Sequence, residues 1–180
     1  MTPGDTAVDT TDVATRSRRV WARAVAYMLL FGISWFVVLP AAILRMEGHA
    51  DPFLRSAASV ALGGALVLAG CAMSWWAGFY LITIGRGTPF PLDPTRTLVT
   101  NGPYRHIRNP QAVGTMLIVL GEIAGVRSRD LLLMIPLSIA YLEGLAAPYE
   151  DRELRTRFGA RYLHYRARVP KWLPRLGAES

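Results

Sequence analysis

The chain has 180 residues, of which 52% are hydrophobic and only 18% are charged, and its net charge is +7. A soluble domain carries roughly 25% charged residues. Two uncharged stretches, 24–44 and 56–85, are each long enough for the roughly 20-residue helix that crosses a bilayer. This pattern excludes a soluble protein with one buried core, and it excludes a membrane β-barrel, whose strands run about 10 residues. A single cysteine, Cys71, excludes an intrachain disulfide framework.

The first 84 residues predict a tail and two membrane helices. Residues 1–15 are small, polar and weakly acidic, and we expect them to be disordered. Within 16–84, arginines precede an apolar run at Ala24–Leu44, which is too long for a signal-peptide core and is interpreted as a retained membrane helix. The second helix lies within Ser56–Ile84, and its small residues favour close helix packing. These small residues are Gly63, Gly64, Ala65 and Gly70.

The second half of the chain predicts a loop, a helical hairpin and a basic helix. Residues 85–110 contain five prolines and four arginines, which exclude one continuous helix and indicate an ordered loop. The apolar runs Gln111–Val126 and Leu131–Tyr149 predict a membrane hairpin. Glu150–Arg168 predicts one basic helix with an apolar stripe, typical of a membrane surface. The expected fold is therefore an all-α integral membrane protein with about four transmembrane helices.

The distribution of basic residues predicts the orientation in the membrane. With four spans, the N-terminal tail, the 85–110 loop and the C-terminal segment carry sixteen lysines and arginines, and the opposite side carries four. The positive-inside rule places both termini in the cytoplasm. Because the arginines cluster at the ends of the apolar runs, lipid headgroups explain the high charge better than nucleic acid does.

The residue types limit the chemistry. The three histidines lie far apart without ligand spacing, so we predict no metal site. The sequence shows no phosphate-binding glycine motif and no serine-hydrolase elbow. Glu122 and Glu143 lie in apolar runs, where an acid either has a function or pairs with a neighbouring helix. Glu150 follows Glu143 by seven residues, which places both on one helix face.

Two motifs carry a resemblance to a known family. The stretch 98–110, Leu-Val-Thr-Asn-Gly-Pro-Tyr-Arg-His-Ile-Arg-Asn-Pro, resembles the proline-rich loop of the isoprenylcysteine carboxyl methyltransferase and phospholipid methyltransferase superfamily. The stretch 150–174, with its acidic pair, Phe158-Gly159, Tyr162, Tyr165 and Val169-Pro170, is similar to the C-terminal signature of that superfamily. Upstream, 87–91 also fits its bacterial members, and the resemblance therefore implies a protein of the bacterial inner (plasma) membrane. The matches cover about half the chain, from residue 85 to residue 175.

The resemblance implies an enzyme, an S-adenosylmethionine-dependent methyltransferase embedded in the membrane, with residues 85–180 as its catalytic region. This region comprises the loop 85–110, the hairpin 111–149 and the C-terminal helix and tail 150–180. We predict Arg108 and Glu150 as catalytic residues, since a fixed guanidinium binds a carboxylate bidentately. The implied cofactor-binding residues are Thr97, Leu98, Val99, Tyr104, Asn109, Pro110, Gln111 and Glu150.

Two departures from the eukaryotic carboxyl methyltransferases affect the predicted acceptor. Those enzymes have histidine where this chain has Asn109, and a substrate-binding arginine where it has Ala146. A carboxylate acceptor is ionised at neutral pH and needs no base, whereas an amine must first lose a proton. We predict carboxyl O-methylation of an isoprenylcysteine-like substrate, with N-methylation of a phospholipid or other lipophilic amine as the alternative. A sterol-type reductase using NADPH and a non-enzymatic membrane scaffold are further alternatives. The partners are thus membrane lipids and a lipophilic acceptor, and the sequence leaves the oligomeric state open.

Overall fold

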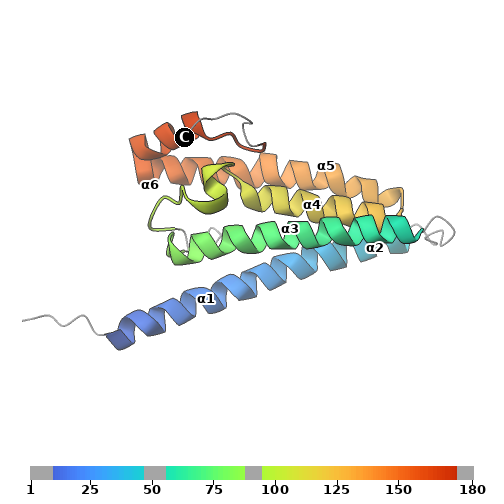
Figure 1. Cartoon of the computed structure of the whole chain (residues 1–180), viewed down its shortest axis with the longest axis horizontal. Coiled ribbons are helices and arrows are strands. Elements are labelled where there is room, and N and C mark those ends of the chain that lie inside the picture. Colours follow the sequence, from blue (N-terminus) through green and yellow to red (C-terminus); the bar gives the residue numbers. More distant parts are fainter. Residues whose placement is uncertain (1–9, 47–55, 88–94, 174–180) are drawn as a thin grey trace, which may run out of the picture.

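The computed structural model of the chain describes residues 10–46, 56–87 and 95–173, with side chains from Trp21 onward (Figure 1). Within these ranges the chain forms helices and no strands, which confirms the predicted all-helical class. Three helical stretches are long and apolar enough to cross a membrane, and a shorter apolar helix lies beside them. The three stretches are Trp21–Met46, Ala57–Thr83 and Asp130–Arg168, and the shorter helix is Pro110–Val126.

The first span is one helical rod with a local change of register. It comprises α1 (Thr10–Ile33), a π-helical turn η1 (Ser34–Val38) and α2 (Leu39–Met46). Proline has no N–H to donate and its ring crowds the carbonyl four residues earlier, so the π turn directly before Pro40 accommodates it without ending the helix. Because α1 begins at Thr10, residues 10–15 of the predicted tail are helical and not disordered. Residues 1–9 lie outside the described part.

The second span, α3 (Ala57–Thr83), begins at a capping box. Ser56 Oγ accepts a hydrogen bond from the Ser59 amide, and Ser59 Oγ accepts one from the Ser56 amide, both at 3.1 Å. This arrangement satisfies two amides that the first helical turn leaves without partners. The helix therefore starts at the point where the uncharged stretch begins.

Glycines bring α3 and α4 (Pro110–Val126) into close contact. A methyl group added to Gly70 would lie 2.6 Å from the Gly114 carbonyl oxygen, and one added to Gly63 would lie 2.6 Å from the Gly121 carbonyl oxygen. The predicted small-residue packing is thus confirmed for Gly63 and Gly70. It is wrong for Gly64, which is exposed with open space around its Cα, because a residue one position along a helix turns about 100° away from the partner.

The third span is continuous from the hairpin turn into the C-terminal region. After Arg127, whose left-handed backbone ends α4, the chain forms η4 (Asp130–Leu133), α5 (Met134–Ile139), the π turn η5 (Ala140–Ala146) and α6 (Ala147–Arg168). Pro148 follows the π turn, as Pro40 follows η1. The predicted hairpin of 111–149 is present, but its second arm does not end at Tyr149.

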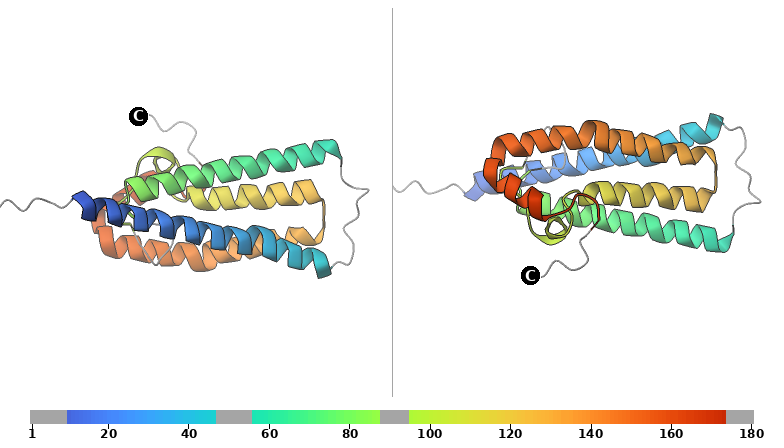
Figure 2. Two further views of the ribbon diagram at one scale, coloured as in Figure 1. Left: turned by 90° about the horizontal axis from the view of Figure 1, so that it is seen from below. Right: turned by 90° about the horizontal axis from the view of Figure 1, so that it is seen from above.

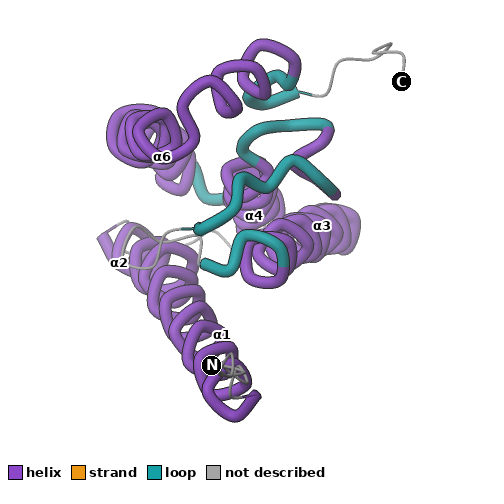
Figure 3. The backbone as a smooth tube through the Cα atoms, turned by 90° about the vertical axis from the view of Figure 1, so that its left-hand side faces the viewer, coloured by secondary structure: helices purple, strands orange, loops and turns teal. Residues whose placement is uncertain are grey.

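The predicted single basic helix over Glu150–Arg168 is wrong in one respect, because Gly159 breaks it. Gly159 has φ 51° and ψ −126°, a backbone conformation open mainly to glycine. The second half of α6 therefore turns back over the loop that precedes α4, as Figures 2 and 3 show. This reversal buries Tyr162 and Tyr165 against the loop, which a straight helix would not allow.

The first span, α3, α4 and the third span run antiparallel to one another in chain order (Figure 1). The N-terminal part of α1, the loop before α4 and the turned-back part of α6 lie at one end of the bundle. The end of α2, the start of α3 and the 127–130 turn lie at the other. The basic segments that the sequence analysis placed on one side of the membrane thus share one end of the molecule.

Candidate active site

The loop before α4 and the segment after α6 are joined by backbone hydrogen bonds. The Arg108 amide donates to the Pro170 carbonyl at 2.8 Å, and the Asn109 amide donates to the Lys171 carbonyl at 3.3 Å. Arg108 also donates from Nε to the Val169 carbonyl at 2.9 Å. The two predicted motifs, 98–110 and 150–174, therefore form one structural unit at the basic end of the bundle.

Tyr104 anchors the loop against α3. It lies in the short 3₁₀ helix η3 (Gly102–Arg105), where its side chain is buried with Val99 and Ala77, and its carbonyl accepts a 2.7 Å hydrogen bond from the Tyr165 hydroxyl. Burial raises the pKa of the Tyr104 hydroxyl well above its ordinary value, and the negative charge of Glu150 raises it further. Tyr104 is therefore a neutral hydroxyl at physiological pH, and the Glu150 carboxylate lies within electrostatic reach of it.

Asn109 combines a structural role with an unused hydrogen-bonding group. It is the N-cap of α4, where Oδ1 accepts a 3.1 Å hydrogen bond from the Ala112 amide, and Pro110 follows at the first helical position, which suits proline. The side chain is half-buried. Its Nδ2 donors have no protein acceptor within the described residues, so they are available to a ligand.

Of the three acids in the first half of α6, Asp151 and Glu153 form ion pairs, and Glu150 does not. Asp151 pairs with Arg155 one helical turn further along. Across the Gly159 turn, it accepts a 2.7 Å hydrogen bond from the Tyr162 hydroxyl and pairs with Arg166. Glu153 pairs with Arg157 at 3.1 Å. Glu150 is exposed and makes no hydrogen bond or ion pair with a described residue. It interacts electrostatically with the acids Glu153 and Asp151 as well as with the cations Lys171 and Arg108.

Glu143 holds the end of the described chain to the third span. Its carboxylate accepts hydrogen bonds from the ammonium of Lys171 and from Trp172 Nε1, the latter at 2.8 Å. The paired interpretation of this acid is therefore the one that the structure shows, with lysine and tryptophan as the partners. Glu122 differs, since its Oε2 is buried without a hydrogen-bond partner in the described part of the chain.

The remaining predicted cofactor residues have unequal access to a ligand. Val99 and Pro110 are buried in the packing of the loop, and Thr97 is exposed. Gln111 is half-buried beside α3, where its Nε2 would lie 3.7 Å from a methyl group added to Gly78. The structure brings Tyr104, Arg108, Asn109 and Glu150 to one end of the bundle, and it adds Lys171, which sequence reasoning missed. Lys171 could be found only from the fold, through the hydrogen bond between its carbonyl and the Asn109 amide and through its ion pair with Glu143.

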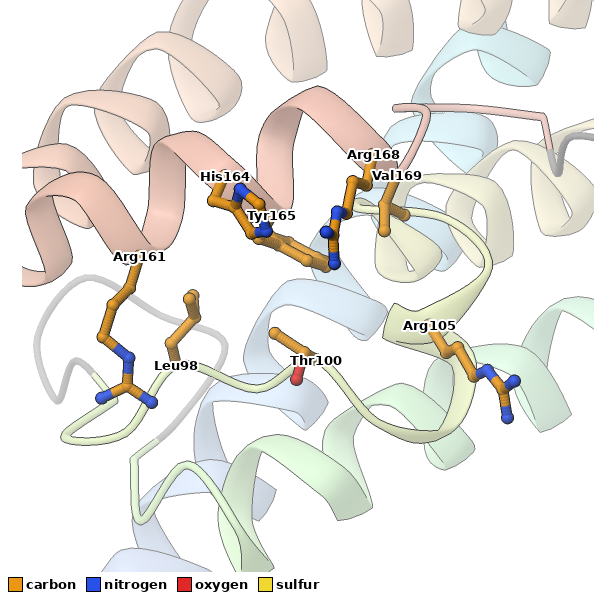
Figure 4. Close-up of a pocket in the computed structure, with 8 residues that line it drawn as sticks. All are labelled: Leu98, Thr100, Arg105, Arg161, His164, Tyr165, Arg168 and Val169. Atoms are coloured by element: carbon orange, nitrogen blue, oxygen red, sulfur yellow. The ribbon is translucent and has the colours of Figure 1, made fainter. Parts of the chain in front are cut away.

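A separate pocket of about 350 Å³ opens between the loop and the turned-back part of α6 (Figure 4). Leu98 is the one predicted cofactor residue that lines this pocket, and four of its other lining residues are basic. In the described residues, no group of three histidine, cysteine or acidic side chains is placed to hold a metal ion.

One comparison with known proteins identifies relatives. A family model described as phospholipid methyltransferase matches residues 58–161, which is more than half of the chain. The match runs from α3 to just past Gly159 and includes Arg108, Asn109 and Glu150. Searches of curated proteins and of solved structures gave no significant match.

Proposed function

Because the chain belongs to the phospholipid methyltransferase family, we propose that it is a membrane-embedded enzyme that methylates a lipophilic acceptor with S-adenosylmethionine as the donor. The predicted superfamily is confirmed by this membership, and with it a methyltransferase in a lipid environment. The observation that carries the specific proposal is the Glu150 carboxylate, which forms no ion pair with a described residue and lies at the same end of the bundle as Arg108, Lys171 and the free donors of Asn109.

The groups at this end of the bundle fit S-adenosylmethionine. The cofactor has a carboxylate, an ammonium group and ribose hydroxyls, and this site offers cations, an acceptor carboxylate and amide donors. Arg108 and Lys171 would hold the carboxylate, and Glu150 would accept hydrogen bonds from the ammonium group or the ribose. The bound cofactor supplies an electrophilic methyl group on a sulfonium.

The chain's own residues then have three tasks in methyl transfer. They orient the donor and acceptor, since well-aligned reacting atoms lie about 3–3.5 Å apart before reaction. The loop and the turned-back helix exclude water that would compete with the acceptor. The neutral Tyr104 adds no charge that would oppose the developing neutralisation of the sulfonium.

The acceptor enters from the lipid in this proposal. The outer faces of the spans expose large apolar side chains, which contact lipid tails in a membrane. Examples are Leu30, Val37 and Leu68, with 67%, 59% and 72% exposure. An acceptor with an apolar tail would therefore partition into the bilayer first and present its head group at the basic end.

Two head groups remain candidates. An isoprenylcysteine-like carboxylate is the first, because it needs no base at neutral pH. A phospholipid amine is the second and is favoured by the name of the matching family and by Glu150, which forms no ion pair with a described residue and would accept a proton from the amine.

Binding of isotope-labelled S-adenosylmethionine to the purified protein tests the site. We expect Glu150→Gln to weaken binding about tenfold or more, since a hydrogen bond to a charged group contributes about 1.5–3 kcal/mol. Glu153→Gln removes the same charge from the same helix at a position paired with Arg157, and it should change affinity less than twofold. Equal effects of both variants would remove Glu150 from the site, and absent binding by the wild type would refute the proposal.

A series of acceptors tests the substrate class. Prenyl thioether acids and alkyl amines of increasing tail length should show rising affinity, because each buried methylene contributes about 0.8 kcal/mol. Faster turnover of acids than of amines with matched tails would identify carboxyl methylation, and the reverse would identify amine methylation. A flat response to tail length would contradict entry from the lipid.

A further inference from the structure

We propose that the pocket between the loop and the turned-back part of α6 binds the phosphate of an anionic phospholipid headgroup. The pocket is lined by three arginines and one histidine: Arg105, Arg161, His164 and Arg168 (Figure 4). All four side chains are exposed and accessible to a ligand. The proposal does not depend on the methyltransferase assignment, because it concerns a different set of residues.

Helix geometry explains why these basic side chains gather. Arg161, His164, Tyr165 and Arg168 follow the spacing i, i+3, i+4 and i+7, so they share one face of the turned-back helix. The reversal at Gly159 lays this face over the loop, which contributes Arg105. A straight α6 would carry the same arginines away from the loop.

The arginines of this pocket differ from three other arginines of the same helix. Arg155, Arg157 and Arg166 each pair with Asp151 or Glu153. Among the residues that the structure describes, neither Arg161 nor Arg168 forms an ion pair, and the same holds for Arg105 across the pocket. These arginines place positive charges along the walls of one pocket, and a bound anion reduces the repulsion between them.

The position and the walls of the pocket favour a lipid phosphate. The loop residues that line it lie just before α4, the apolar helix that starts at Pro110, so the pocket lies near the level where the bilayer's headgroups begin. Its other walls include apolar groups from Leu98, Tyr165 and Val169, which suit the glycerol and ester region of a lipid. Guanidinium groups bind phosphate oxygens through paired, charge-assisted hydrogen bonds.

Calorimetric titration of the detergent-solubilised protein with short-chain lipids tests this proposal. We expect dioctanoyl phosphatidic acid to bind, dioctanoyl phosphatidylcholine to bind far more weakly, and higher salt to weaken the first. The double variant Arg161→Gln/Arg168→Gln should lower the affinity for phosphatidic acid about tenfold or more, since two charge-assisted contacts are lost. Arg161→Lys/Arg168→Lys keeps both charges and should retain most of the binding.

Arg152→Gln is the matched control. It removes one arginine from the first half of α6, away from the pocket, and should change the affinity less than twofold. Loss of binding in this control equal to that in the double variant would overturn the proposal, as would unchanged binding in the double variant. Inorganic phosphate binding as tightly as phosphatidic acid would overturn the assignment to a lipid headgroup and identify a soluble phosphate instead.

Discussion

Glu150, Asp151 and Glu153 lie within one four-residue stretch of α6, yet their surroundings give them different roles. Asp151 is held by Tyr162 and Arg166, which reach it only because the helix reverses at Gly159. The sequence pattern marks an acidic pair without distinguishing its members. Asp151 can therefore be told apart from Glu150 only by its tertiary contacts, which the spacing of the acids in the sequence does not predict.

Asn109 offers a test at the residue scale, because its two functional atoms are separable. Asn109→Asp keeps the capping oxygen but removes the Nδ2 donors, and aspartate caps helices about as well as asparagine. We expect its melting temperature to stay near that of the wild type while S-adenosylmethionine affinity falls about three- to tenfold, the range of one lost hydrogen bond. Thermal unfolding followed by circular dichroism, together with calorimetric binding, measures both quantities.

Ser56→Ala is the matched control for the cap. It removes the N-cap of α3, far along the bundle, and should lower stability by about 1 kcal/mol without changing cofactor affinity. If Asn109→Asp bound the cofactor as tightly as the wild type, Asn109 would be a cap and nothing more.

At the scale of helices and loops, the sequence predicted those segments that a single stretch of residues determines. The two uncharged runs, the proline-rich loop and the 127–130 turn were expected from composition, and the structure contains each within the part it describes. The break at Gly159 was not expected, because a lone glycine in a helical pattern is tolerated unless tertiary contacts favour a turn. The π turns before Pro40 and Pro148 were also missed, since a proline usually indicates an end to the helix.

The contact between α3 and α4 gives a prediction at the element scale. In Gly70→Ala the new methyl group would lie 2.6 Å from the Gly114 carbonyl oxygen, and backbone cannot move aside as a flexible side chain does. Overpacking of this kind costs about 1–3 kcal/mol. We therefore expect a lower melting temperature in detergent, measured by the same circular dichroism assay.

Gly64→Ala in the same helix is the comparison, because nothing lies within 4 Å of its added methyl group. Alanine also has the higher helix propensity, by about 1 kcal/mol, so this variant should unfold at the wild-type temperature or slightly above it. Equal destabilisation by both variants would show that the glycines do not mediate the contact between the two helices.

At the scale of the whole molecule, the antiparallel arrangement gathers the basic segments at one end, and the same end holds the candidate active site and the arginine pocket. The positive-inside rule then predicts which side of the membrane this end faces. The uneven distribution of charge can be read from the sequence alone. The contact between the two motifs, 98–110 and 150–174, becomes visible only in the fold. The orientation itself stays a prediction.

Single-cysteine labelling tests that orientation. In a Cys71→Ala background, Arg129→Cys places a thiol in the turn at one end of the bundle, and Arg152→Cys places one on α6 near the other; Arg129 and Arg152 are both exposed. We expect a membrane-impermeant maleimide to label the first in intact spheroplasts and the second only after permeabilisation, because the sixteen basic residues should face the cytoplasm. Both substitutions remove one arginine, so they alter the charge equally. Labelling of Arg152→Cys from outside would invert the topology and move the site to the outer face, and labelling of both from outside would contradict a span between them.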